Sequence, residues 1–160
     1  MRAEADFANF VQNLLTARKI PAELESTTNV ELAAALKTAS KNLTGRQGYP
    51  DHIAVIGDYV LVMEDKSDHS RLILRNGSDY SMTPAATKNY AVNGAIFYAR
   101  KILDGTRYTK IFAFGNVGDR KHHTFKPIFI SADTVKELPD VQTFIDFAPE
   151  NIDAYYNRAV

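Results

Sequence analysis

The sequence of 160 residues contains no cysteine. The absence of cysteine excludes disulfide bridges, thiolate metal sites and a cysteine nucleophile, and it suits a reducing cytoplasm. No apolar run approaches the length that a helix needs to cross a bilayer, so we expect no membrane partner. The first residues carry acids and lack the hydrophobic core of a signal peptide, and we therefore expect a cytoplasmic protein.

An excess of charge of one sign is also lacking. The chain carries 19 Lys and Arg against 19 Asp and Glu, so its formal net charge is zero. A free-standing, non-specific DNA binder is usually basic, because phosphate neutralisation supplies most of that affinity. If this chain acts on DNA, we expect another module to deliver the DNA. Basic residues predominate between residues 100 and 126, which form either a local basic face or a solvated surface of mixed charge.

Motifs of several other enzyme classes are absent. The sequence has no phosphate-binding glycine loop, no nucleotide-binding fingerprint and no serine–histidine pair that would indicate nucleophilic catalysis. It also has no internal repeat and no low-complexity tract. With 45% hydrophobic and 24% charged residues, the composition is that of an ordinary globular protein. The length allows one domain with a substantial core.

A β-hairpin is the element around which the chain is organised. Its arms are residues 53–56 and 59–63, and Gly57-Asp58 is the turn between them. Both arms are apolar and rich in β-branched residues, which is typical of strands buried inside a domain.

Charged residues stand at the open end of this hairpin. Asp51 precedes the first arm, and Glu64-Asp65-Lys66 follows the second. Because strand side chains alternate between faces, Glu64 and Lys66 point one way and Asp65 the other, and we interpret His52 as structural. If the hairpin is in register, Asp51 and Glu64 converge at one end of the sheet. Two carboxylates and a lysine there form a candidate divalent-metal site.

Helices are predicted from apolar residues at spacings of three and four. The first covers residues 2–19, and the second covers 30–42 with Asn29 as its N-cap. The third covers 85–104, has the strongest helical pattern in the chain, and ends at Gly105.

The remaining segments complete an α/β pattern. Residues 110–115 form a buried strand that follows the helix over 85–104, so a right-handed crossover places it parallel to part of the hairpin. Residues 125–131 predict a further strand, residues 140–147 a short helix, and residues 150–160 another helical turn or the start of a linker. We therefore expect a central mixed β-sheet flanked by helices.

Pro50-Asp51, a hairpin's length of chain, and then Glu64-x-Lys66 resemble the PD-(D/E)xK signature of metal-dependent nucleases. The position of these residues on a hairpin strengthens the resemblance, since each half of the signature is common by itself.

The flanking segments resemble one subgroup of these nucleases. Residues 39–41, 45–51 and 90–99 are similar to the nuclease domain that precedes N6-adenine DNA methylases in type I-like and type IIG restriction–modification proteins. The resemblance covers roughly residues 30–130, so we treat it as similarity over a domain.

The resemblance implies a restriction-endonuclease-like core and Mg²⁺ as the cofactor, for which Mn²⁺ substitutes. It implies that Asp51 and Glu64 bind the metal, with the backbone carbonyl of Asp65 as a third ligand. Lys66 would orient or activate the attacking water, and its alternative is a surface lysine paired with an acid. Many such nucleases add a glutamate from the preceding helix. Glu31 is the candidate here, and its alternative is a favourable interaction with the helix N-terminus.

Four further residues are candidate DNA contacts. Two glycines bracket Arg46 and permit close approach to a phosphate, although an ordinary glycine-rich connection explains them as well. Lys41 lies in the segment that resembles the nuclease subgroup. Related nucleases carry a glutamine and a tyrosine on the helix after the lysine strand. Here that helix offers Asn93 with Phe97 and Tyr98, which departs from the pattern, and Asn93 and Tyr90 are candidate neighbours of the site.

The leading hypothesis is a Mg²⁺-dependent DNA endonuclease domain, the cleavage module of a restriction–modification enzyme. We divide residues 1–160 into a helical N-terminal part (1–44), a catalytic core (45–131) and a helical tail (132–160), together a piece of a larger protein. The implied partners are DNA, methylase and target-recognition modules, and a second copy for double-strand cleavage. The alternatives are a catalytically silent DNA- or protein-binding module, or a nuclease acting on branched DNA or RNA.

Overall fold

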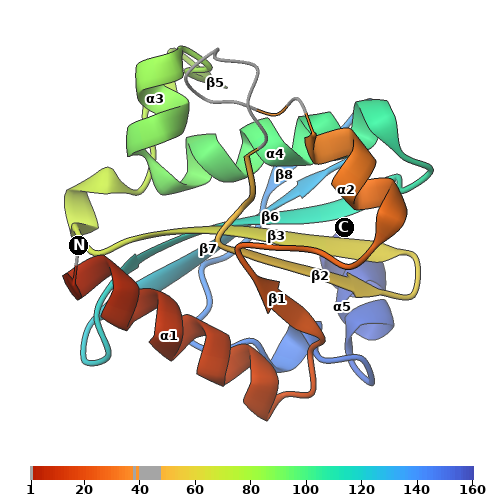
Figure 1. Cartoon of the computed structure of the whole chain (residues 1–160), viewed down its shortest axis with the longest axis horizontal. Coiled ribbons are helices and arrows are strands. Elements are labelled where there is room, and N and C mark those ends of the chain that lie inside the picture. The colour runs from red at the N-terminus through yellow and green to blue at the C-terminus, as the bar shows by residue number, and fades with distance from the viewer. Residues whose placement is uncertain (1, 38, 40–47) are drawn as a thin grey trace.

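A six-stranded mixed sheet forms the centre of the computed structural model, which describes residues 2–37, 39 and 48–160 (Figure 1). The strands lie in the order β1-β2-β3-β6-β7-β8. Their bounds are β1 (Ala22–Leu24), β2 (His52–Ile56), β3 (Tyr59–Lys66), β6 (Lys110–Gly118), β7 (His123–Ile130) and β8 (Val135–Glu137). The helices are α1 (Arg2–Ala17), α2 (Val30–Leu36), α3 (Pro84–Asn89), α4 (Ala91–Gly105) and α5 (Ile152–Ala159).

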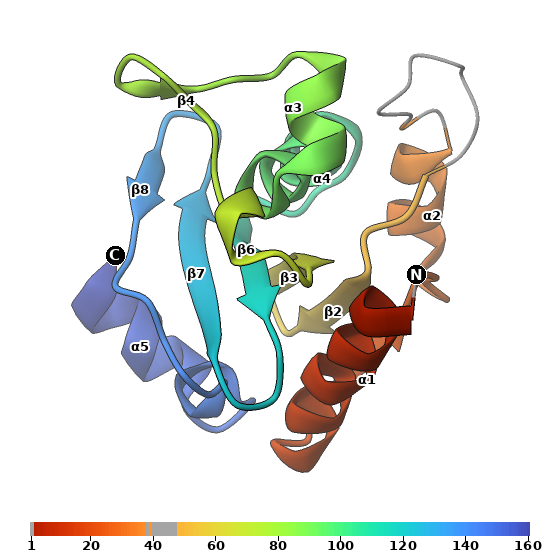
Figure 2. The same ribbon diagram turned by 90° about the vertical axis from the view of Figure 1, so that its left-hand side faces the viewer.

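Helices cover both faces of the sheet (Figure 2). On one face, Val11 of α1 and Ile152 of α5 join a hydrophobic core with Leu61 of β3. On the other face, Leu36 of α2 and Ile96 of α4 join a second core with the alternate residues of the same strands. The predicted α/β class, with a central mixed sheet flanked by helices, is confirmed. Within the described residues, no helix is both long and apolar enough to cross a membrane.

The predicted hairpin is confirmed in its arms and its turn. β2 and β3 pair antiparallel, with His52 opposite Met63 and Ile56 opposite Tyr59. Gly57 in the turn has a φ of +58°, a conformation that residues with a side chain rarely adopt. β3 also pairs parallel with β6, as the crossover through α4 predicts.

The predicted helix over 85–104 is wrong as a single element. It is divided into α3 and α4 at Tyr90, whose backbone is extended (φ −120°, ψ 132°). The backbone N–H of Val92, at the start of α4, donates to the carbonyl of Leu72 across 2.8 Å. We call residues 67–83, between β3 and α3, the linking segment. This segment thus supplies the hydrogen-bond acceptor for the first turn of α4.

The two ends of the chain differ in detail from the prediction. α1 and α5 are confirmed, and Asn29 caps α2 by accepting the Leu32 N–H across 2.9 Å. Residues 140–147 are helical only over Ile145–Phe147, because the N–H and carbonyl of Val141 both bond to Phe125 of β7.

The sheet draws strands from all three predicted parts of the chain. β1 comes from the part predicted to be helical, residues 1–44, and pairs with β2. β8 comes from the predicted tail, residues 132–160, and pairs with β7. The edge strands therefore join the ends of the chain to the central hairpin.

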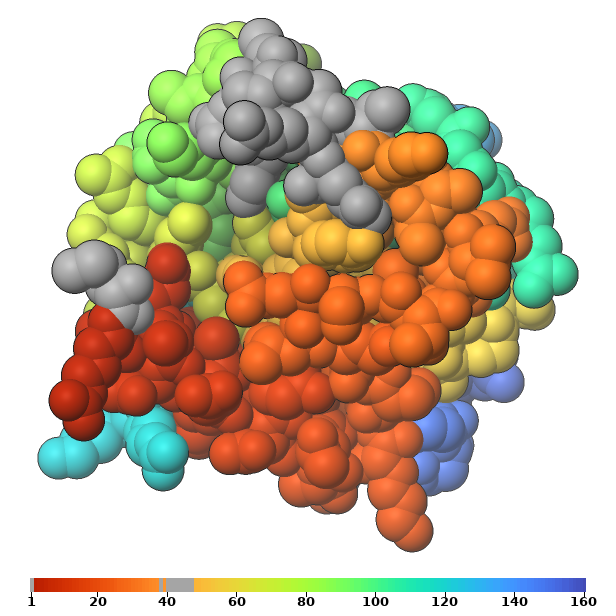
Figure 3. Space-filling model, in the orientation of Figure 1, coloured from red at the N-terminus to blue at the C-terminus, as the bar shows by residue number. Residues whose placement is uncertain are grey.

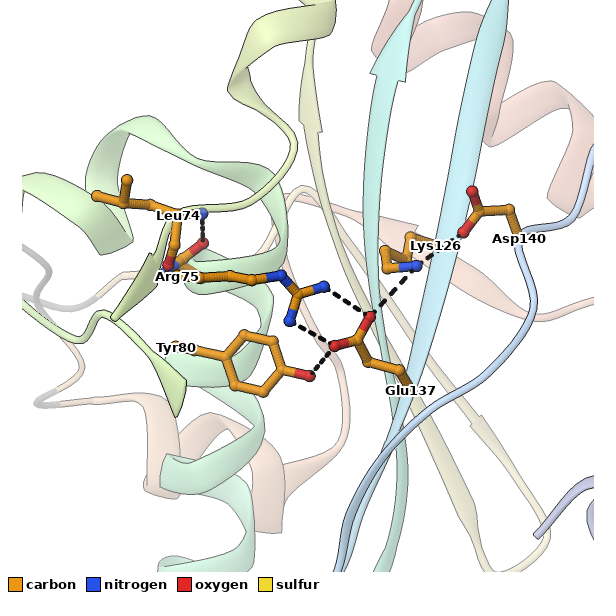
Figure 4. A network of polar contacts seen from close by, with 7 residues as sticks. Leu74, Arg75, Tyr80, Lys126, Glu137 and Asp140 are labelled. Atoms are coloured by element: carbon orange, nitrogen blue, oxygen red, sulfur yellow. Dashed lines mark hydrogen bonds and ion pairs between the residues drawn. The ribbon is translucent and has the colours of Figure 1, made fainter. Parts of the chain in front are cut away.

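A polar network fastens the linking segment to the edge of the sheet (Figure 4). Within that segment, β4 (Arg75–Asn76) and β5 (Asp79–Tyr80) form a short hairpin. The guanidinium of Arg75 donates twice to the Glu137 carboxylate of β8, across 2.7 and 2.9 Å, and the Tyr80 hydroxyl donates across 2.8 Å. The bonds from Arg75 lower the pKa of Glu137 to about 2.

The Glu137 contacts predict a loss of stability in acid. Because the folded pKa of Glu137 lies below its ordinary value of 4.5, its stabilising contribution is complete above about pH 4.5 and is lost as the pH falls toward about 2. Arg75 and Glu137 are both partly exposed, so we expect their ion pair to contribute about 0.5–1 kcal/mol to the free energy of unfolding. Urea unfolding of Glu137→Gln should show this deficit near neutral pH and a much smaller one in acid. Glu150→Gln, the control, should match the unmodified protein, and an equal Glu137→Gln deficit at both pH values would contradict the assignment.

Candidate functional site

The two predicted ligand acids lie together where β2 begins and β3 ends. The backbone N–H of Asp51 donates to Oε2 of Glu64 across 2.9 Å. The backbone N–H of Asp65 donates to Oδ2 of Asp51 across 2.8 Å. A backbone N–H at the end of each strand therefore binds a carboxylate at the end of the neighbouring strand. The predicted convergence of Asp51 and Glu64 at one end of the sheet is confirmed. We call Asp51 and Glu64 the acidic pair.

The acidic pair and the residue Asp65 face opposite sides of the sheet. Glu64 is only 4% exposed and lies beside Gly94 of α4. Asp65 points to the α1 face, where its carboxylate contacts the ring of His52. This arrangement agrees with the alternation that the strand pattern predicts for these three residues of the hairpin.

A glycine of α4 makes room for the Glu64 side chain. A Cβ on Gly94 would lie 3.2 Å from Oε1 and 3.3 Å from Cγ of Glu64. It would also lie 2.7 Å from the carbonyl oxygen of Thr87, which is closer than Cβ atoms approach. The close packing of α4 against the acidic pair therefore depends on a residue without a side chain at this position.

One helical turn after Gly94, Tyr98 brings a phenol to the site. Its side chain is buried, and burial together with the negative charges of Glu64 and Asp51 raises the pKa of Tyr98 well above its ordinary value of 10. The phenol is therefore protonated near neutral pH and carries a hydrogen-bond donor in the field of the acidic pair.

The Lys66 ammonium is directed toward α1. Its Nζ lies 3.8 Å from Oε1 of Glu4, and both side chains are partly exposed. This contact agrees with the alternative in which Lys66 pairs with an acid elsewhere in the chain. An exposed ion pair of this kind contributes at most about 1 kcal/mol, so an exchange of partner by Lys66 costs little.

Glu31 is not part of the site, which corrects the prediction of a catalytic role. Its carboxylate accepts the backbone N–H of Arg107, and its Oε1 lies 3.2 Å from Nε of the same residue. Arg107 precedes β6, which begins beside Tyr59. Glu64 lies five positions after Tyr59 in the same strand, about 17 Å away at the usual rise of a strand. Glu31 therefore lies toward the opposite end of β3.

Asn93 also requires a correction, because it cannot reach DNA. Its side chain is 0% exposed. The amide oxygen accepts the Leu74 N–H across 2.9 Å, and the amide nitrogen donates to the carbonyls of Leu74 and Ser81, each across 2.8 Å. Asn93 therefore anchors the linking segment to α4.

The other three predicted DNA contacts have different outcomes. Lys41 and Arg46 lie outside the described residues. Tyr90 is partly buried at the N-cap of α4, and the guanidinium carbon of Arg71 lies 5.3 Å from the centre of its ring. A DNA contact by Tyr90 stays a prediction.

Gly94 and Tyr98 were not predicted as site residues, although the sequence carries a signal for them. The two residues are four positions apart, so they share one side of the predicted helix. A glycine inside a helix costs about 1 kcal/mol relative to alanine, and it often marks a close approach.

The oxygen atoms of the acidic pair suit a hard divalent cation. Mg²⁺ is commonly held by one or two carboxylates together with water and substrate phosphate. A carboxylate has about four lone-pair directions, so it can accept an N–H bond and bind a cation together. Among the described residues, no group of three or more His, Cys, Asp or Glu side chains is placed to hold a metal ion. A cation here therefore relies on two carboxylates, completed by backbone oxygen, water or substrate.

Fold and site together define the class of domain. A six-stranded mixed sheet flanked by helices, with acids at the strand ends of its central hairpin, is consistent with a restriction-endonuclease-like core.

Comparison with known proteins agrees with this class. Over 141 residues, or 86% of this chain, the sequence is 34% identical to the type II restriction enzyme and methyltransferase RM.BcgI of Heyndrickxia coagulans. The chain spans 22% of the length of that relative. No known family matches the chain, and no solved structure matches it. The similarity supports a relationship to restriction–modification proteins.

Gly94→Ala should destabilise the fold, although alanine is the better helix former. Alanine normally gains about 1 kcal/mol over glycine inside a helix. Here the added Cβ meets the Thr87 carbonyl, so we expect a net loss of about 1–3 kcal/mol in the free energy of unfolding, as in overpacked cores. Chemical denaturation measures this loss. Arg100→Ala, at an exposed position of α4, should change stability by less than about 0.5 kcal/mol. A gain in stability for Gly94→Ala would contradict the close approach.

Proposed function

We propose that this chain is a Mg²⁺-dependent endodeoxyribonuclease domain of the PD-(D/E)xK type, the cleavage module of a restriction–modification enzyme. The observation that carries the proposal is the acidic pair, which the backbone holds together at the ends of β2 and β3. The similarity to a restriction enzyme over 86% of the chain supports it independently.

Each residue of the site has a role in phosphodiester hydrolysis. Asp51 and Glu64 would bind Mg²⁺ through their carboxylates, with the backbone carbonyl of Asp65 as a third oxygen. The bound cation would supply charge stabilisation and an activated water. Lys66 orients that water and offsets negative charge on the phosphoryl oxygens. The protonated phenol of Tyr98 adds a hydrogen-bond donor beside the acids.

Lys66 must change partners to act in this way. In the structure its ammonium pairs with Glu4, at the exposed start of α1. A DNA phosphate carries a full negative charge and would compete with the Glu4 carboxylate for the ammonium. We therefore propose that substrate binding draws Lys66 from Glu4 toward the acidic pair.

A hollow beyond the end of β3 offers a path for the DNA strand. It has a volume of about 710 Å³ and lies between the start of α1 and the turn after β6, which Figure 3 shows side by side. Ser67, which follows Lys66, lines it together with Arg120 and Lys121. Within the described residues these two cations form no ion pair. Asp6 and Asp119 line the same hollow, so its lining carries no net positive charge, and a partner module that delivers DNA stays part of the proposal.

Methylase and target-recognition modules would lie in the remaining part of a longer protein, as the combined name of the relative suggests. A single site of this kind cuts one strand, so pairing of two copies would complete a double-strand break.

The second candidate is a catalytically silent module that binds DNA or protein on the same fold. The observation that favours it is the contact of Lys66 with Glu4, which leaves the acidic pair without its predicted lysine. A silent module would take up neither Mg²⁺ nor Mn²⁺ and would be indifferent to loss of the acids.

Substitution of the site should abolish metal-dependent DNA cleavage while the fold is retained. We expect Asp51→Asn, Glu64→Gln and Lys66→Ala each to lower the cleavage rate by about 100-fold or more, since each removes a charge that stabilises the transition state. The measurement is nicking of duplex DNA with Mg²⁺, alongside circular dichroism, in a protein that contains its DNA-recognition part.

Glu31→Gln is the matched control, because it removes a carboxylate outside the site. It should cleave at the normal rate. Full activity in all three site variants would refute the site, and preference for branched DNA or RNA in the same assay would reassign the substrate.

A further inference from the structure

A buried polar network lies directly behind the acidic pair, on the α1 face of the sheet. It consists of Gln12 of α1, His52 of β2, Asp65 of β3 and Asn116 of β6. The side chains of His52 and Asp65 are 1% and 0% exposed. Titratable groups this deeply buried are costly unless they are paired, so their presence beside the proposed site requires an explanation.

The orientation of Gln12 fixes one proton of the network. Its amide nitrogen donates to the carbonyl of Ala22 in β1 across 2.9 Å. The amide oxygen therefore faces Nδ1 of His52, at 2.8 Å, and Nδ1 must carry a hydrogen to donate.

The second ring nitrogen then requires a shared proton. Nε2 of His52 lies 2.5 Å from Oδ2 of Asp65. An imidazole nitrogen without hydrogen and an ionised carboxylate are both acceptors, so a contact this short needs one proton between them. One hydrogen therefore lies between the two side chains and joins His52 to Asp65.

Asp65 is thereby held on both of its oxygens. Its Oδ1 accepts the amide of Asn116 across 3.0 Å, while Oδ2 is bound to His52. On the opposite side of the strand, the backbone N–H of the same residue donates to Oδ2 of Asp51. A displacement of the Asp65 backbone that broke these side-chain contacts would also move the N–H that holds Asp51.

We infer that His52 and Gln12 are positioning residues of the proposed active site: they hold Asp65 from the far face of the sheet, and Asp65 holds the carboxylate of Asp51. This inference rests on the proposed function for its catalytic meaning. It connects α1 and β1 to the proposed metal-binding end of the hairpin through Gln12. His52 and Gln12 touch neither substrate nor cation.

The test compares substitutions that break the network with one that preserves it. Gln12→Met removes the acceptor for Nδ1 at nearly constant volume, and His52→Gln removes the shared proton. Phe144→Leu is the control for stability, since it alters the same hydrophobic core without touching the network.

Mn²⁺ affinity, measured by calorimetry well below the melting temperature, is the first readout. We expect Gln12→Met and His52→Gln to weaken it by about tenfold or more, as loss of an outer-shell partner usually does. Phe144→Leu should bind Mn²⁺ as the unmodified protein does. Unchanged affinity in the two breaking variants, or an equal loss in Phe144→Leu, would overturn the inference.

Hydrogen exchange of the Asp65 amide is the second readout and needs no metal. We expect slow exchange in the unmodified protein and in Phe144→Leu, and exchange at least about tenfold faster in Gln12→Met and His52→Gln. If the unmodified protein binds no Mn²⁺, the proposed function fails, and the exchange data still decide whether the network holds Asp65. Equal protection in all variants would overturn the positioning role.

Discussion

The structure depends on two reciprocal hydrogen bonds that join the start of β2 to the end of β3. The N–H of Asp51 binds the Glu64 carboxylate, and the N–H of Asp65 binds the Asp51 carboxylate. Each of the two carboxylates therefore accepts a backbone hydrogen bond from the neighbouring strand end, and these bonds fix where both side chains lie. Carboxylate oxygens are the ligands that small divalent cations prefer.

The surrounding elements support these two hydrogen bonds from both faces of the sheet. On one face, α4 approaches closely at Gly94 and brings the phenol of Tyr98 to the acids. On the other face, the contact between His52 and Asp65 holds the end of β3. The linking segment leaves β3 directly after this site and is anchored by the buried amide of Asn93, so the chain is also held after the end of β3.

Much of the fold and of the site was predictable from local sequence patterns, and the wrong predictions share one cause. A β-branched hairpin with a glycine turn determines its own register, and strand alternation then places the acids together and Asp65 behind them. The partners of Glu31 and Lys66 come from segments distant in sequence, Arg107 and Glu4, and periodicity carries no information about them. The break between α3 and α4 likewise depends on a tertiary hydrogen bond.

The most direct test of the central claim is the anomalous scattering of Mn²⁺ in a crystal of this domain. The account predicts one peak between the acidic pair, with a carboxylate oxygen of Asp51 and one of Glu64 each at about 2.0–2.3 Å, the range for small divalent cations with oxygen ligands. An ordered protein with no peak there, or with Mn²⁺ bound only elsewhere, would contradict it.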